Sequence, residues 1–266
     1  MTEPQNQFPF RAEQIGSLVR PEALLAARNA FNDGRLDAEG LGRAEDAAII
    51  GAIKRQEEIG LGAVSDGEFR RSVYSESFTA KALSGVEIQL TEDTGWSASN
   101  DLGHRMARRV PQISGPVRWK GSPNVPSFEF LKSHAAGTGK VTLPGPAFIH
   151  YRAGRANISA EIYPDLDKFW SDLTAAYHAE MQALAAAGCT YLQIDETAII
   201  KLGDERVRGL LTMRGDDWRD LLDVYMTAIN AVVRGAPDGL QIALHVCRSS
   251  DRKSTRLNSS HEWISY

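Results

Sequence analysis

Short apolar segments that end in glycine or polar residues alternate with longer segments of helical periodicity along this chain. Strands that alternate with helices indicate a parallel sheet covered by helices. Polar groups that collect at the carboxyl ends of such strands are typical of a (β/α)8 barrel, whose active sites lie at that end. The strand endings are Ile15-Gly16-Ser17, Asp66-Gly67-Glu68, Gly145-Pro146, Asp195-Glu196 and His245-Val246-Cys247.

The expected fold is therefore α/β: a (β/α)8 TIM barrel that is truncated at its C-terminus, because only six of eight strands are found. The segment between residues 72 and 106 is polar and irregular and is expected to be an insertion. Strands are expected at 12–17, 62–66, 109–117, 140–143, 190–194 and 240–244, and helices at 21–31, 45–59, 125–135, 165–187 and 216–234.

The last residues differ in character from the rest of the chain. Residues 251–266 read as the conceptual translation of a sequencing adapter, from Asp251-Arg252-Lys253-Ser254 to Ile264-Ser265-Tyr266. We therefore expect two parts: a partial barrel over residues 1–250 and a non-native tail over residues 251–266.

Composition narrows the function classes. The chain has 266 residues, a net charge of −4 and two cysteines. An acidic balance argues against a general nucleic-acid binder, and two cysteines cannot form a disulfide framework. Neither a signal segment nor an apolar run of about 20 residues is evident. We expect a cytoplasmic protein that acts on small molecules, without nucleic-acid or membrane partners.

His245 and Cys247 form the most informative motif. Residues two apart in a strand point to the same side, so both could reach one metal ion. Zinc accepts imidazole nitrogen and thiolate sulfur, and a catalytic zinc site has at least three protein ligands. On spacing alone, a core cysteine beside a hydrogen-bonded histidine remains open.

Two acidic motifs also follow strands. In Asp195-Glu196, neighbouring side chains point to opposite faces, so only one should face the barrel mouth. There it could hold a substrate ammonium group, and capping of a following helix is the structural alternative. Asp66-Gly67-Glu68, followed by Arg70 and Arg71, could serve a site or form a local ion-pair cluster of little energetic weight.

Taken in order, five segments resemble the cobalamin-independent methionine synthase family, specifically its catalytic C-terminal barrel and short single-barrel relatives. The resemblance spans residues 11 to 248. The segments are Arg11 to Leu18, Ser65 to Arg71, Leu143 to Pro146, Gln193 to Glu196 and His245 to Arg248.

This resemblance implies a barrel with zinc (Zn2+) at the strand carboxyl ends. Ile15, Gly16 and Ser17 would contact the amino-acid part of homocysteine, and Glu68 and Asp195 would bind its ammonium group. His245 and Cys247 would be the first two zinc ligands. The family's other two ligands, a glutamate and a second cysteine, and the histidine that acts as an acid are absent from this chain.

The expected activity is zinc-dependent transfer of a methyl group from 5-methyltetrahydrofolate to homocysteine, in methionine biosynthesis. The folate donor is in question because the family's folate-contacting positions fall near Met106, Ala107 and Arg152, which do not match. One alternative is alkyl transfer to another small thiol, such as a coenzyme M-like acceptor. Another is an inactive fragment, because a partial barrel leaves two unpaired sheet edges.

Overall fold

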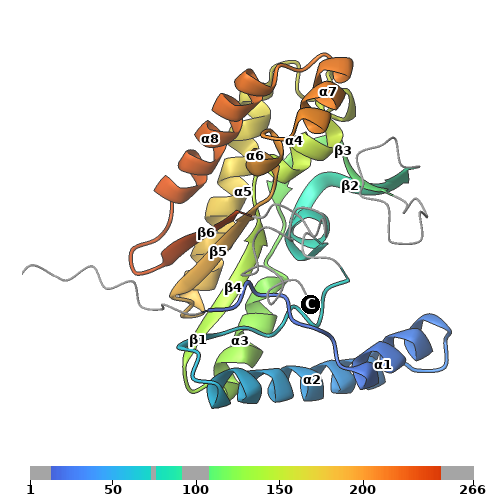
Figure 1. The fold of residues 1–266 in the computed structure, drawn as a ribbon, viewed down its shortest axis with the longest axis vertical. Helices are drawn as coiled ribbons and strands as arrows, with labels where there is room; N and C mark the ends of the chain where they lie inside the picture. The colour runs from blue at the N-terminus through green and yellow to red at the C-terminus, as the bar shows by residue number, and fades with distance from the viewer. Residues whose placement is uncertain (1–12, 73–75, 92–107, 247–266) are drawn as a thin grey trace, which may run out of the picture.

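A parallel sheet of four strands forms the centre of the molecule (Figure 1). The computed structural model describes residues 13–72, 76–91 and 108–246. Within this sheet each neighbouring pair of strands is parallel, so a crossover connection is needed between them. In sheet order the strands are β1 (Ala63–Val64), β4 (Thr138–Pro144), β5 (Tyr191–Glu196) and β6 (Gln241–Val246).

The helices begin and end where the sequence provides capping groups. Asp37, Asp165, Asp204 and Asp217 each accept a backbone N–H at a helix start, which satisfies a donor that the helix leaves unpaired. The α-helices are α1 (Glu22–Asn32), α2 (Ala38–Glu58), α3 (Asn124–His134), α4 (Ala147–Ala153), α5 (Leu166–Ala186), α6 (Ala198–Lys201), α7 (Glu205–Arg214) and α8 (Trp218–Arg234), with a π-helix η1 (Glu76–Ala82) and a 3-10 turn η2 (Arg155–Asn157).

Alternation along the central strands gives the sheet one apolar and one polar face. Leu143 and Ile194 are fully buried in the main core, which also contains Phe169 and Leu173 of α5. Successive strand residues point to opposite faces, so Lys140, Thr142, Gln193 and Asp195 share the other face. The apolar face therefore anchors the sheet to the helices, and the polar face is available for chemistry.

The five expected helices are present, with ends that move by a few residues except that α2 starts at Ala38 rather than residue 45. The strands expected at 62–66, 140–143, 190–194 and 240–244 are also present. The described residues of the segment expected at 12–17 form no strand, which is a correction. Their carbonyls are taken by side chains of the sheet instead of by a neighbouring strand.

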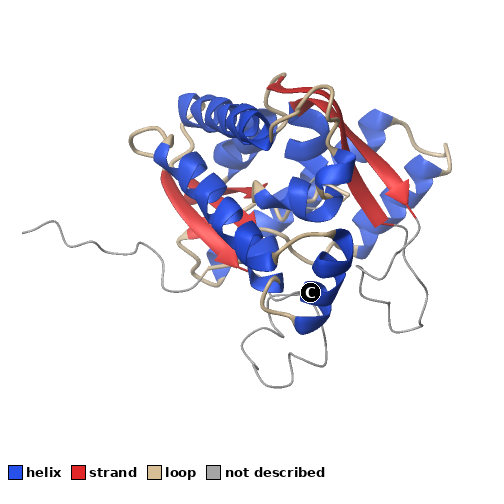
Figure 2. Ribbon diagram, turned by 90° about the horizontal axis from the view of Figure 1, so that it is seen from above, coloured by secondary structure: helices blue, strands red, loops and turns tan. Residues whose placement is uncertain are grey.

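A second correction concerns the segment expected to be an irregular insertion. It contains η1 and β2 (Leu83–Thr91), and β2 pairs antiparallel with β3 (Arg108–Trp119) in a separate hairpin (Figures 1 and 2). Val86 and Ile88 alternate with Glu87 and Gln89, which is the period of a strand with one covered face. The strand expected at 109–117 thus belongs to the hairpin, and the parallel sheet has four described strands rather than six.

Across residues 13–72, 76–91 and 108–246, no helix is long and apolar enough to cross a membrane.

Candidate active site at the polar face of the sheet

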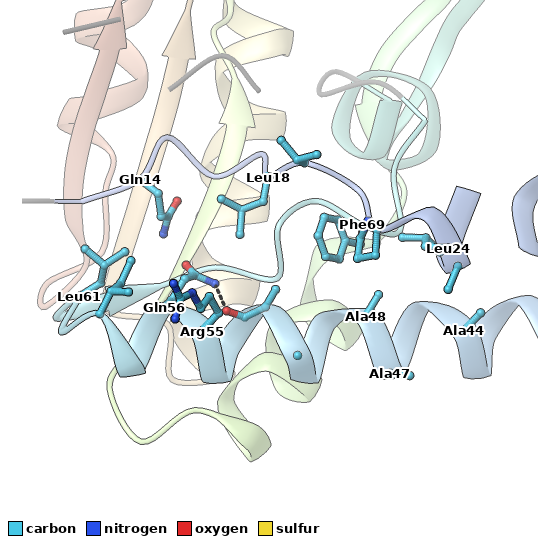
Figure 3. A pocket seen from close by; sticks show the side chains of 16 residues that line it. Gln14, Leu18, Leu24, Ala44, Ala47, Ala48, Arg55, Gln56, Leu61 and Phe69 are labelled. Atoms are coloured by element: carbon cyan, nitrogen blue, oxygen red, sulfur yellow. Dashed lines mark hydrogen bonds between the residues drawn. The ribbon is translucent and has the colours of Figure 1, made fainter. Parts of the chain in front are cut away.

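The segment from Glu13 to Leu18 crosses the central strands, and Figure 3 shows Gln14 to Leu18 running over them. Gly16 is buried with φ +109°, a backbone conformation that favours glycine. A Cβ at this position would lie 2.4 Å from Thr142 Cγ2 and 3.1 Å from Glu68 Oε1. Glycine at position 16 therefore allows the backbone to lie directly against Thr142 and Glu68, with Ile15 and Ser17 half-buried on either side.

Glu68 is placed by a tight turn after β1. Its φ of 57° is the one positive value at a non-glycine residue in the described ranges, and Asp66 Oδ1 accepts its backbone N–H at 2.9 Å. The side chain is 2% exposed, and Thr142 Oγ1 donates to Glu68 Oε1 at 2.6 Å. Strained backbone of this kind clusters at functional sites.

The two arginines that follow Glu68 have different roles. Arg70 forms ion pairs with Glu45 and Asp46 of α2. Arg71 is buried, with Nη1 at 3.5 Å from Glu68 Oε1, and it donates to the hydroxyl and the carbonyl of Thr142. The ion-pair alternative thus holds for Arg70, whereas Arg71 belongs to the environment of Glu68.

Asp195 and Glu68 form a buried acid pair, the name used below for these two residues. Asp195 is 6% exposed and its Oδ1 accepts from Gln193 Nε2 at 2.6 Å. Burial, and then the charge of Glu68, raise the pKa of Asp195 to about 7. Burial also raises the pKa of Glu68, although Arg71 and Thr142 oppose that change. A cation bound beside both carboxyl groups would offset the desolvation that raises their pKa values, so their ionisation and cation binding favour each other.

Glu196 occupies the opposite side of β5. It is 0% exposed, and its Oε1 accepts from the backbone N–H groups of Ala198 at 2.7 Å and Ile199 at 3.3 Å, at the start of α6. Of the two explanations that the sequence left open, helix capping holds for Glu196. Asp195 lies on the other face of β5 and pairs with Glu68.

His245 is the register partner of Asp195 across β5 and β6, so the two side chains share a face of the sheet. It is half-buried. Cys247 lies outside the described residues. Within the described part of the chain, no group of three or more His, Cys, Asp or Glu side chains could hold a metal ion. The described residues alone therefore do not make a zinc site, although His245 lies beside the acid pair.

Four polar residues here were given no role of their own from the sequence: Lys140, Thr142, Gln193 and Arg71, the last of which was noted only as part of the motif around Glu68. Three of them lie on the polar face at alternating positions, and that alternation in Lys140-Val141-Thr142-Leu143 and in Leu192-Gln193-Ile194-Asp195 was a usable signal. Lys140 is 1% exposed, and its burial lowers its pKa. Arg71 gave no comparable signal, because its spacing does not distinguish it from Arg70.

A separate apolar pocket of about 630 Å³ lies between α2 and the chain from Gln14 to Leu24 (Figure 3). Alanine, leucine and valine side chains provide most of its walls. It does not contain the acid pair, and its walls offer few groups for acid–base or metal chemistry.

The chain matches a known family over most of its length. Residues 10–259 match the family described as "Cobalamin-independent synthase, Catalytic domain". The match includes residues 251–259 of the segment expected to be non-native. The chain is 30% identical over 99% of its length to the uncharacterized protein YxjH of Bacillus subtilis, and it covers 68% of that protein.

Two further similarities point the same way. The chain is 29% identical over 91% of its length to a 5-methyltetrahydropteroyltriglutamate–homocysteine methyltransferase of Synechococcus, of which it spans 29%. A crystal structure of a putative vitamin-B12 independent methionine synthase from Listeria monocytogenes superposes with a TM-score of 0.72 at 32% identity, covering 90% of this chain and 66% of that one. The chain therefore belongs to the cobalamin-independent methionine synthase family of methyltransferases, whose catalytic domain it matches.

Proposed function

We propose that this protein transfers a methyl group to the sulfur of homocysteine. The observation that carries the proposal is the acid pair: two buried carboxyl groups beside the close-packed backbone of Gly16. An ammonium group bound between them would favour the ionised form of both acids, because an opposite charge offsets their desolvation. Homocysteine carries such an ammonium group on its amino-acid end. Ile15, Gly16 and Ser17 would contact the same end of the molecule.

We propose 5-methyltetrahydrofolate as the methyl donor, which agrees with the name of the Synechococcus relative. The thiolate sulfur attacks the methyl carbon in line, so that a sulfur–carbon bond forms while the nitrogen–carbon bond breaks. The electron pair stays on the donor nitrogen, which must be protonated beforehand to leave. The acid pair contributes by holding and orienting the amino acid during this step.

We propose zinc as the cofactor, with His245 and Cys247 as its first two ligands. The support is the His-x-Cys spacing at a strand end and the position of His245 on the face of Asp195. A zinc ion lowers the pKa of a thiol that it binds and so supplies a thiolate at neutral pH. Of these two ligands, His245 lies within the described residues and Cys247 lies outside them.

We also propose that the parallel sheet is part of a (β/α)8 barrel, with its polar face inside. The support is the helix-covered apolar face, the strand-end position of the acid pair and the similarity to the Listeria structure. Residues 251–266 would then be a non-native tail that follows β6. Reading the gene from source DNA through the codon for Ser250 tests this directly, because a genuine Asp251-to-Tyr266 sequence would contradict it.

A coenzyme M-like acceptor is less well supported. A sulfonate requires a cation. Arg20 lies near the acid pair and donates to the backbone carbonyls of Glu68 and Arg71. The other arginine there is Arg71. Its guanidinium already donates to the hydroxyl and the carbonyl of Thr142 and lies 3.5 Å from Glu68. The surroundings therefore favour an ammonium-bearing acceptor over a sulfonate.

The test is steady-state methyl transfer by the product of the gene as read from source DNA. We expect Asp195→Asn and Glu68→Gln to raise the KM for homocysteine by about 10- to 150-fold, the equivalent of a charged hydrogen bond. Asp223→Asn on the exposed side of α8 is the control and should leave it unchanged. An unchanged KM in both acid variants, or faster alkylation of mercaptoethanesulfonate than of homocysteine, would overturn the proposal.

A further inference from the structure

Three successive backbone carbonyls of the N-terminal segment are each bound by one side chain of the sheet. Lys140 Nζ donates to the carbonyl of Gln14 at 2.5 Å, Gln193 Nε2 to that of Ile15 at 2.8 Å, and Ser65 Oγ to that of Gly16 at 2.7 Å. The donors come from β4, β5 and the residue after β1, and all three are at least 97% buried. These bonds take the place of a strand ladder and fix the path of residues 14–16.

Gln193 differs from the other two donors because its amide also reaches the acid pair. The same nitrogen donates to Asp195 Oδ1 at 2.6 Å. A primary amide has two N–H groups, so one can serve Ile15 and the other Asp195. The Ile15 carbonyl can only accept, so the amide nitrogen and not the amide oxygen faces Ile15. The same orientation brings this nitrogen to Asp195.

We propose that Gln193 is a positioning residue that sets the spacing between the backbone of residues 15–16 and the carboxylate of Asp195. This inference rests on the proposed function, in which those two groups hold neighbouring parts of the amino acid. The segment cannot move closer to β4, because Gly16 already lies so near Thr142 that a Cβ on it would be 2.4 Å from Thr142 Cγ2. A shift of the segment away from β5 would therefore alter how the amino acid fits without removing any group that touches it.

The chain offers a matched control in Gln56. It is 3% exposed, like Gln193, and its amide donates to the carbonyls of Ala52 and Ser65 at 3.0 and 2.9 Å. It thus fastens α2 to the end of β1 and does not contact the acid pair. Gln56 Oε1 also accepts the backbone N–H of Ser65 at 2.9 Å. Replacement by methionine keeps the approximate size and removes two buried hydrogen bonds at Gln193 and three at Gln56, so Gln56→Met should lose at least as much stability as Gln193→Met.

The experiment measures methionine binding by calorimetry and homocysteine kinetics in the product of the gene as read from source DNA. We expect Gln193→Met to weaken methionine binding about tenfold and to raise the KM for homocysteine similarly, the order expected for a lost buried hydrogen bond to a charged group. The kcat should change less than the KM. Gln56→Met should lower the melting temperature at least as much and leave the affinity unchanged.

Equal effects of the two methionine variants on affinity would overturn the inference, because a general loss of stability would then explain both. If Asp195→Asn leaves methionine binding intact, the proposed function itself fails. If Asp195→Asn weakens binding and Gln193→Met does not, only the positioning role fails. Gln193→Leu removes the same two N–H donors with an apolar side chain, so it should weaken binding to a similar extent. Misfolding of both Gln193 variants while Gln56→Met folds would show a structural role and would also overturn the inference.

Discussion

Replacement of Gly16 by alanine tests how the N-terminal segment meets the sheet. The new Cβ would lie 2.4 Å from Thr142 Cγ2, which is closer than real Cβ atoms approach their neighbours, and 3.1 Å from Glu68 Oε1. The backbone would also retain φ +109°, a conformation that alanine rarely adopts. Both effects act in the folded state, so the substitution should reduce the free energy of unfolding.

Two contributions set the size of that loss. Strained backbone costs about 1–3 kcal/mol and overpacking about 1–3 kcal/mol, so Gly16→Ala should destabilise the protein by about 2–6 kcal/mol. Thr142→Ser removes the clashing Cγ2 and keeps the hydroxyl that donates to Glu68. By itself it should cost about 1 kcal/mol, the value of one buried methyl group.

The assay is a double-mutant cycle by urea denaturation of the wild type, Gly16→Ala, Thr142→Ser and the double variant. The double variant should lose at least about 1 kcal/mol less than the sum of the single variants, because serine relieves the packing contribution. The backbone contribution should remain. Additive losses, or a cost of Gly16→Ala below about 0.5 kcal/mol, would refute the close approach of Gly16 to Thr142.

Three further outcomes are expected. A bound ammonium group should lower the pKa of Asp195, which is about 7 in the free protein. Methionine binding should therefore release about 0.9 proton at pH 6 and about 0.1 proton at pH 8. Calorimetry in buffers of different ionisation enthalpy measures this release, and equal release at both pH values would contradict the prediction. Glu196→Ala removes the cap of α6 and should destabilise the protein by about 1–3 kcal/mol with little change in methionine affinity, as denaturation and calorimetry together will show. Cys247→Ser should abolish both stoichiometric zinc, measured by elemental analysis, and methyl transfer, and retained turnover would rule out the zinc proposal.

Five helices could be predicted from the sequence because their signals are local, whereas α4, α6 and α7 were not expected. Asp165 and Asp217 cap helices that carry apolar residues at helical spacing, and Gly188 follows α5 with φ +91°. These features depend on a few neighbouring residues, so tertiary contacts did not override them. The cap at Asp37 was overlooked, so the expected start of α2 was too late.

The segment at residues 13–18 was mispredicted because its conformation depends on distant groups. Ile15 sits in an apolar-looking stretch, but its carbonyl is bound by Gln193, which is 178 residues away in the chain. The hairpin of β2 and β3 was missed for a different reason. A register shift between Ser84 and Val86, with Gly85 at φ 73°, separates the alternating residues that begin at Val86 from the start of β2.

Glu68 and Asp195 could be chosen from the sequence because each follows a strand and matches a family motif. Their electrostatic coupling could not, because the raised pKa of Asp195 arises from burial and from the charge of a residue on another strand end. Gln193 and Thr142 lie at alternating positions that indicate a polar face, but their partners in the site depend on which strands are neighbours in the sheet.

The most direct test of the central claim compares two ligands that differ only in the amino group. Methionine and 4-(methylthio)butanoate share the thioether and the carboxylate, and the second lacks the ammonium group. If the acid pair holds an ammonium, methionine should bind at least about tenfold more tightly, and Asp195→Asn should remove most of that preference. Equal affinity of the wild-type protein for both ligands would contradict the account.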